Sequence, residues 1–197
     1  PIYDQYGTTV SKEEAARHLK LSPDKNYILF FGLVRKYKGL DLLLEAFAGS
    51  ALRNNHTLLI AGEFYDNPEI YHNIIKKNNL QQDVIIHDKF IPDADVRYYF
   101  SISDLVTQTY RTATQSGISQ MAFHFEKPML VTNVGGLGEI IKNEVSGLVA
   151  EPDINSIRER LNFYSTMGNN QIFVPHIKIE KEKYSWTVFT SVLLGDR

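Results

Sequence analysis

Three consecutive stretches decide the fold that this sequence predicts: YILFFGL at residues 27–33, RKYKG at residues 35–39 and DLLLEAFA at residues 41–48. The first stretch is continuous in large apolar residues, as parallel strands are when helices cover both faces of their sheet. The second stretch is a polar loop. In the third, Leu43, Leu44 and Phe47 recur at spacings of three and four, which predicts a helix with one buried face. The unit is a buried strand, a loop and a covering helix.

The same alternation continues along the chain. Further strands are predicted at residues 57–61, 84–87, 105–109, 129–132 and 148–150. Helices are predicted at 11–19, where Ser11 and Glu14 form a capping box, from Pro68, and at 93–101, 116–125, 138–142, 154–158 and 185–194. Because each parallel strand pair needs a right-handed crossover, which a helix supplies, this order predicts an α/β fold. It is a doubly wound, Rossmann-like parallel sheet of about six strands with helices on both faces.

Composition limits the possible partners. The 197 residues carry 21 Lys and Arg against 23 Asp and Glu, so no global basic field attracts nucleic acid or anionic lipid. With no Cys the chain has no thiolate zinc site and no thiol nucleophile, and we expect a cytoplasmic location. The longest apolar stretch, Tyr27 to Val34, is too short to span a bilayer. The first residue is Pro rather than Met, so we expect an excised domain.

The loops that follow the strands are the candidate site, because doubly wound sheets bind ligands beyond the carboxyl ends of their strands. The loop after the first strand holds Arg35 and Lys38 near Gly32, which suits either a phosphate group or a solvated basic turn. The segment from Gln115 to Ile118 begins a helix. Its small and polar residues suit either an anion at the helix N-terminus or simple capping.

Two other loops give weaker signals. Phe90-Ile91-Pro92 is apolar and either faces a base or packs against the core. The glycines of the segment from Val134 to Glu139 lack the full dinucleotide fingerprint, since Ile141 stands where its last Gly belongs. We therefore expect no nicotinamide cofactor.

A metal site is also not expected. The six His are scattered, at positions 18, 56, 72, 87, 124 and 176, and no pair has metal-ligand spacing. Asp93-Ala94-Asp95 follows Pro92 at a predicted helix start, where acidic residues are common. Tyr184-Ser185-Trp186 is interpreted as a buried aromatic anchor.

The motifs fall in an order that resembles the C-terminal domain of group 1 (family four) glycosyltransferases, one half of the GT-B fold. The resemblance covers Pro23 to Pro152, and the opening Pro1-Ile2-Tyr3 is similar to the linker from an N-terminal domain. It implies a linker and short helix at residues 1–22 and a donor-binding domain with C-terminal helices at 23–197. The motifs that carry it are FFGLVRKYKGLD at 30–41, IAG at 60–62, SDLV at 103–106, KPMLVTNVGGLGE at 127–139 and SGLV at 146–149.

The resemblance implies a site for a nucleoside diphosphate sugar, which is a substrate rather than a cofactor. It transfers diphosphate contacts onto Arg35, Lys38, Ser116, Gly117 and Ile118, and contacts with the base, ribose or sugar onto Phe90, Ile91, Gln115 and Gln120.

One departure from the family concerns its usual pair of glutamates, eight residues apart. Counting back from Lys127-Pro128, the matching positions are Thr112 and Gln120, so no catalytic residue is assigned in this chain.

The activity implied by the resemblance is retaining, metal-independent transfer of a hexose to a glycan or lipid-linked acceptor. The chain's own N-terminal acceptor-binding domain would be its partner, and would hold it at the inner face of the membrane. Two alternatives remain open: a nucleotide-sugar epimerase of the same fold, which would need carboxylates at the sugar, and a non-catalytic binding domain.

Overall fold

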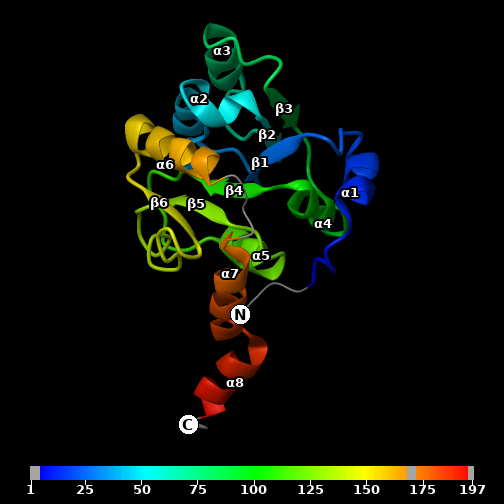
Figure 1. Cartoon of the computed structure of the whole chain (residues 1–197), viewed down its shortest axis with the longest axis vertical. Helices are drawn as coiled ribbons and strands as arrows, with labels where there is room; N and C mark the ends of the chain where they lie inside the picture. Colours follow the sequence, from blue (N-terminus) through cyan, green and yellow to red (C-terminus); the bar gives the residue numbers. More distant parts are fainter. Residues whose placement is uncertain (1–4, 168–171, 195–197) are drawn as a thin grey trace.

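The computed structural model describes residues 5–167 and 172–194 and contains one six-stranded parallel sheet (Figure 1). Its order is β3-β2-β1-β4-β5-β6, the order of a doubly wound nucleotide-binding fold. The predicted fold class is confirmed, while Pro1-Ile2-Tyr3 lie outside the described residues. The strands are β1 (Asn26–Phe31), β2 (His56–Ala61), β3 (Val84–His87), β4 (Leu105–Gln108), β5 (Met129–Thr132) and β6 (Gly147–Ala150).

Helices cover both faces of the sheet (Figure 1). Helix α2 packs against α3 and α6, α1 packs against α4, and α5 packs against α7. In Figure 1, α7 and α8 extend away from the sheet toward the C-terminus. The helices are α1 (Lys12–Leu19), α2 (Leu40–Ala48), α3 (Glu69–Lys77), α4 (Asp93–Ile102), α5 (Gly117–His124), α6 (Ile154–Thr166), α7 (Val174–Lys183) and α8 (Trp186–Leu194), with 3-10 turns η1 (Lys36–Lys38) and η2 (Ala51–Asn54).

The core lies between the sheet and these helices. Tyr27, Leu29 and Phe30 of β1 are fully or almost fully buried, as the continuous apolar pattern predicts. Helix α1 begins where its capping residue predicts, since Ser11 Oγ accepts a hydrogen bond from the Glu14 amide at 3.1 Å.

The predicted helix at 138–142 is wrong. Residues 135–139 form turns, and the chain then runs through bends to an isolated bridge between Asn143 and Gly147. Glycines at 135, 136 and 138 disfavour a helix by about 1 kcal/mol each. The first strand also ends two residues early, because Gly32 has a φ of 91°, outside the strand region.

Two features of the C-terminal region differ from expectation. Helix α7 was not predicted, because it buries only Ile177 and Glu180 and most of its other residues are charged or polar. The interpretation of Tyr184-Ser185-Trp186 as a buried anchor is wrong for Trp186, whose side chain is 53% exposed. Tyr184 does pack, with its ring stacked on Phe123 at a centroid distance of 5.4 Å.

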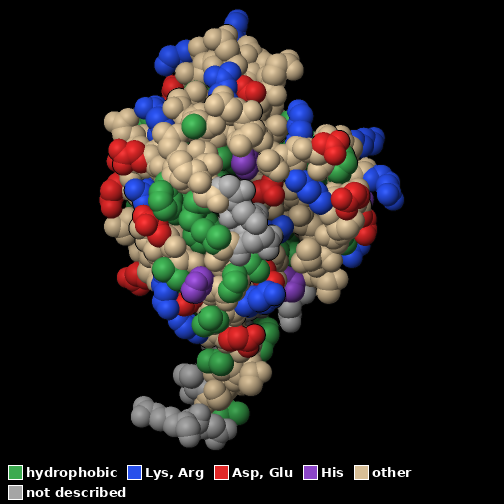
Figure 2. Space-filling model, viewed as in Figure 1, with side chains coloured by type: hydrophobic (Ala, Val, Ile, Leu, Met, Phe, Trp, Pro, Cys, Tyr) green, Lys and Arg blue, Asp and Glu red, His purple; other side chains and the backbone are tan. Residues whose placement is uncertain are grey.

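Charges of both signs are interspersed on the face that Figure 2 shows. Among the described residues, no helix is long and apolar enough to cross a membrane.

A close contact joins the turn after β1 to the end of β4. Gly39 has a φ of 65°, and a Cβ atom added to it would lie 2.0 Å from the Thr109 carbonyl oxygen. The Thr109 hydroxyl donates to the Gly39 carbonyl oxygen at 3.0 Å. Only glycine fits here without moving one of the two segments.

We expect Gly39→Ala to lower the free energy of unfolding by about 2–4 kcal/mol, the sum of a left-handed backbone and a steric clash. The matched control is Gly7→Ala, where φ is 80° but the added Cβ would lie 3.6 Å from its nearest neighbour, Arg97 Cδ. The free energy of unfolding of this control should fall by about 1–2 kcal/mol, which is the contribution of the left-handed backbone alone. Urea denaturation of both variants measures the difference, and equal losses would show that the contact with Thr109 is unimportant.

Candidate functional site

The candidate site lies at the carboxyl ends of β1 and β4, where the strand order reverses. β2 lies on one side of β1 and β4 on the other, with Ile28 paired to Leu105 and Phe30 to Thr107. The loops that leave β1 and β4 therefore separate above the sheet and leave a crevice between them. These are the loops that carry Lys38 and the residues preceding α5.

Lys38 is the most unusual charged residue of the crevice. Its side chain is buried, with 9% of the residue exposed, and none of the described carboxylates forms an ion pair with its ammonium group. Its Nζ lies over the ring of Tyr110, 5.8 Å from the centroid, and faces Gly32, which leaves room for it. Burial, and secondarily the charge of Arg35, lowers the pKa of Lys38 to about 8. A buried cation without a counter-charge indicates an anion site.

Arg35 lies in the same turn but points elsewhere. Its guanidinium carbon lies 4.1 Å from the centroid of the Tyr65 ring, a cation–π contact with the loop after β2. Arg35 thus adds positive potential near Lys38, while its side chain packs on Tyr65 instead of lining the cavity beside Lys38.

The N-terminus of α5 faces Lys38 across a cavity of about 340 Å³. Residues 113–118 line one side of this cavity, and Lys38 and Tyr110 line the other. Ser116 caps the helix, with its Oγ accepting from the Ile118 amide at 3.3 Å and lying 3.3 Å from the Tyr110 hydroxyl. The cavity therefore combines a buried ammonium with a helix N-terminus, two independent sources of positive potential.

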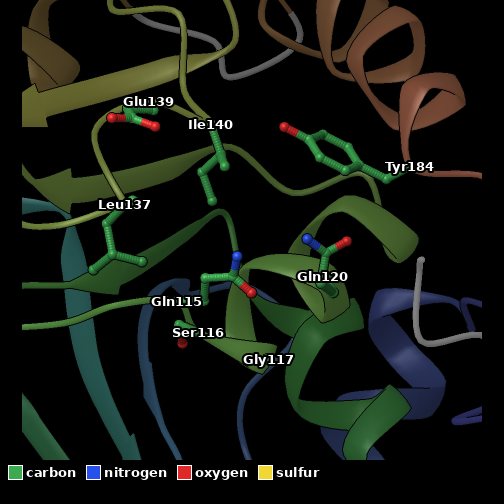
Figure 3. A pocket seen from close by; sticks show the side chains of 9 residues that line it. Gln115, Ser116, Gly117, Gln120, Leu137, Glu139, Ile140 and Tyr184 are labelled. Atoms are coloured by element: carbon green, nitrogen blue, oxygen red, sulfur yellow. The ribbon is translucent and has the colours of Figure 1, made fainter.

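Gln115 and Gln120 line a second cavity, of about 380 Å³, between α5, the loop after β5 and α7 (Figure 3). Gln115, Ser116 and Gly117 line both cavities, so the two adjoin at the helix N-terminus. Gln120 lines only the second and is separated from Lys38 by the helix. The structure thus brings Gln115 and Lys38 into one cavity but leaves Gln120 in the neighbouring one.

Phe90 and Ile91 line a third cavity, of about 280 Å³, at the ends of β1, β2 and β3. Phe90 is 68% exposed and Ile91 is buried, so one side chain is open to a ligand and the other packs. Gly32 lines this cavity and also faces Lys38. The three cavities follow one another along the carboxyl edge of the sheet.

The sequence did not indicate the ion pair and hydrogen bonds that hold the turn of Lys38 in place. The Arg111 guanidinium forms a bidentate pair with Asp41, with both distances 2.8 Å, and the Arg111 amide donates to the Tyr37 carbonyl at 2.7 Å. The Lys36 amide donates to the carboxylate of Asp66. These partners are about 30 and 70 residues apart in sequence, so no local pattern signals them.

Glu139 and Tyr184 were also not predicted to line a cavity, yet both lie in the one that holds Gln120. Glu139 ends the motif at 127–139 that carries the resemblance, and Tyr184 was interpreted as an aromatic anchor, but neither pattern indicates a cavity. Among the described residues, no three His, Cys, Asp or Glu side chains gather as a metal site would require.

The sheet order and the helices on both faces define a Rossmann-like domain. The chain belongs to the group 1 glycosyltransferases, because the family model described as "Glycosyl transferases group 1" matches residues 11–171. The resemblance stated from the motifs is thereby confirmed.

Relatives and solved structures agree with this assignment. The glycosyltransferase MJ1178 of Methanocaldococcus jannaschii is 29% identical over 171 residues, which are 83% of this chain and 45% of that protein. HepE of Anabaena, solved in complex with UDP-glucose, superposes with a TM-score of 0.79 at 17% identity, covering 98% of this chain and 56% of HepE. The C-terminal domain of LpcC, a group 1 family protein of Francisella tularensis, has a TM-score of 0.75 at 16% identity and covers 92% and 95%. The chain thus spans less than half of the curated relatives that it matches.

If the cavity of Lys38 binds an anion, the lowered pKa of Lys38 predicts that the affinity depends on pH. An anion favours the protonated ammonium, so affinity for inorganic pyrophosphate should be full below pH 8 and fall above it, by up to about tenfold per pH unit. The free energy of unfolding depends on pH in the opposite direction to the affinity. Because the folded-state pKa lies below the ordinary 10.5, the unfolded chain binds more protons between pH 8 and 10.5, and stability rises with pH there.

Calorimetric titration of Lys38→Met and Lys36→Met tests this. In Lys38→Met, pyrophosphate is the group whose titration remains. The fall in affinity above pH 8 that is due to Lys38 should therefore be absent. Lys36 is exposed in the same turn, so Lys36→Met should keep it. The same pH profile in the wild-type chain and in Lys38→Met would contradict the assignment.

Proposed function

We propose that this chain is the donor-binding domain of a retaining glycosyltransferase that moves a hexose from a nucleoside diphosphate sugar to a glycan or lipid-linked acceptor, without a metal ion. The observation that carries the proposal is the buried, unpaired ammonium of Lys38 in the cavity at the N-terminus of α5. The diphosphate of such a donor matches these two sources of positive potential. HepE, a neighbour in fold, was solved with UDP-glucose, which supports a ligand of this class.

The proposal assigns each part of the donor to a cavity. The diphosphate is assigned to the cavity of Lys38, with Arg35 adding to the potential and the amides of Ser116 and Gly117 as donors. Ile118, whose amide donates to Ser116 Oγ, is assigned as a lining residue. In the neighbouring cavities, the base is assigned to Phe90 and Ile91, and the ribose or sugar to Gln115 and Gln120.

The chemistry open to these residues is stabilisation of the leaving group. As the bond between the sugar and the diphosphate breaks, negative charge grows on the phosphate oxygens. An ammonium and helix amides fixed in a buried cavity stabilise that charge without reorganising, and so lower the barrier to transfer. Lys38 can also keep a proton close to these oxygens, because a bound dianion favours its protonated form.

The acceptor and the remaining catalytic groups are assigned to an N-terminal domain of a longer protein. The C-terminal domain of LpcC, which this chain covers to 95%, and the curated relatives, of which it covers 33–45%, support this division. A cytoplasmic location, with that domain at the inner face of the membrane, is part of the proposal.

Membership of the glycosyltransferase family favours this function over its two alternatives. An epimerase needs acid and base groups at the sugar, whereas Glu139 is the one carboxylate among the described residues that line the cavity of Gln120. A binding domain without catalytic role would share the donor site and differ only in lacking transfer by the full-length protein.

Lys38→Ala should weaken nucleoside diphosphate binding by about 1.5–3 kcal/mol, or about 10- to 100-fold, the usual range for a hydrogen bond to a charged group. Arg35→Ala should act in the same direction. Titration of the 197-residue chain with UDP, GDP and ADP measures both effects, with Lys36→Ala as the exposed control from the same turn. Unchanged affinity in both variants would show that this loop does not contact the diphosphate.

The 197-residue chain should fold and bind the donor but transfer no sugar, because the proposal assigns the acceptor to a domain outside these residues. Product analysis with radiolabelled nucleotide sugars, with and without candidate glycan acceptors, checks this. Measurable transfer by the purified chain would show that it holds a complete active site.

A further inference from the structure

The cavity that holds Gln120 has a fixed relation to the diphosphate site. It adjoins the cavity of Lys38 at Gln115, Ser116 and Gly117. On its other side, the cavity of Lys38 leads past Gly32 to the apolar cavity of Phe90. A diphosphate bound at the N-terminus of α5 thus has an apolar cavity on one side, suited to a base, and this polar cavity of about 380 Å³ on the other. With the base in the apolar cavity and the diphosphate in the cavity of Lys38, the part of the donor left for the polar cavity is the hexose ring.

The described walls of this cavity hold one carboxylate, several neutral polar groups and no basic side chain. Gln120 comes from α5, Tyr184 follows the last residue of α7, and Glu139 lies on the loop after β5 (Figure 3). The Glu139 side chain is exposed, and none of the described lining residues is Lys, Arg or His. The side-chain oxygen Oε1 of Gln120 is buried with no hydrogen-bond partner among the described groups. A buried carbonyl oxygen without a donor is costly. Because the Gln120 side chain lines the cavity, rotation of its terminal amide would bring this oxygen to a ligand hydroxyl.

We propose that this cavity binds the sugar ring of the donor and selects uncharged or amino hexoses over uronic acids, with Glu139 as the residue that determines the choice. This inference rests on the proposed function and names the substrate class of the same site. A sugar hydroxyl or amine donates to the carboxylate of Glu139 and to the Gln120 carbonyl, and the Tyr184 hydroxyl can donate or accept. The carboxylate of a uronic acid would meet the Glu139 carboxylate. None of the described lining residues is a Lys, Arg or His, so only the amides at the N-terminus of α5 act against this repulsion.

The Glu139 carboxylate acts on specificity through charge, so its effect has a signature that a structural role lacks. Replacing it by Gln keeps the size of the side chain and a hydrogen-bonding group but removes the negative charge. Discrimination against a uronic acid should therefore fall, and in the wild-type chain it should weaken as ionic strength rises. Replacing a residue that only supports the fold would change the melting temperature. It would leave unchanged the discrimination against a uronic acid and the dependence of that discrimination on ionic strength.

The experiment compares dissociation constants of UDP, UDP-glucose and UDP-glucuronic acid for the 197-residue wild-type chain, Glu139→Gln and a control variant. The control is Glu159→Gln, an exposed glutamate of α6 that lines none of the three cavities and makes the same change in net charge. We expect the wild-type chain to bind UDP-glucose about tenfold more tightly than UDP-glucuronic acid. Glu139→Gln should reduce this ratio to about twofold or less, and Glu159→Gln should leave it unchanged.

A second variant separates the sugar contact from the fold. Gln120→Leu removes the buried, unpartnered oxygen, so its melting temperature should be equal to that of the wild type or higher. It should also lose the gain in affinity of UDP-glucose over UDP. An intact gain would remove Gln120 from the sugar site.

The outcomes distinguish this inference from the proposed function. If the wild-type chain binds UDP and UDP-glucose, but Glu139→Gln and Glu159→Gln give the same ratio of UDP-glucose to UDP-glucuronic acid, the inference is overturned and the proposed function stands. If the wild-type chain binds none of UDP, GDP or ADP, both are overturned.

Discussion

The close approach of Gly39 to the end of β4 is the constraint on which the site depends. The turn after β1 lies directly against Thr109, and the pair of Arg111 with Asp41 ties the same two segments together. Because β1 and β4 are neighbours at the point where strand order reverses, this contact holds the turn of Lys38 beside the N-terminus of α5. The strand order places the turn after β1 beside the end of β4, and the absence of a side chain at Gly39 allows the two segments to approach this closely.

Most of the fold could be predicted from sequence because its strands are buried on both faces. Continuous apolar runs such as 27–31 and 57–61 leave no other local structure that hides so much apolar surface. The failures have local causes. The segment at 138–142 is short and begins with Gly138, so it has little helix propensity of its own. Helix α7 buries two residues, one of them the charged Glu180, so it shows no apolar stripe.

The candidate site was predictable only in part. The sequence shows which residues follow a predicted strand. This is why Lys38 and the residues at the start of α5 were singled out together. Burial is not visible, and the burial of Lys38 is what distinguishes it from Lys36, two residues earlier and exposed. Side-chain direction is also hidden. Arg35 turns to Tyr65 because the loop after β2 presents an aromatic ring, and the faces of α5 divide Gln120 from Lys38.

The electrostatics of the strand ends follow from this division. Burying Lys38 without a carboxylate destabilises the empty domain, and the lowered pKa is the measure of that penalty. Under the proposed function, a bound diphosphate would offset this penalty, which would add to its affinity and stabilise the charge that grows on it as it leaves. In the proposal above, Glu139, which lies on the loop after β5, opposes negative charge in the adjoining cavity. The charge of the donor would then lie in the cavity of Lys38, between two cavities for its uncharged ends, and this order would fix the direction in which the donor binds.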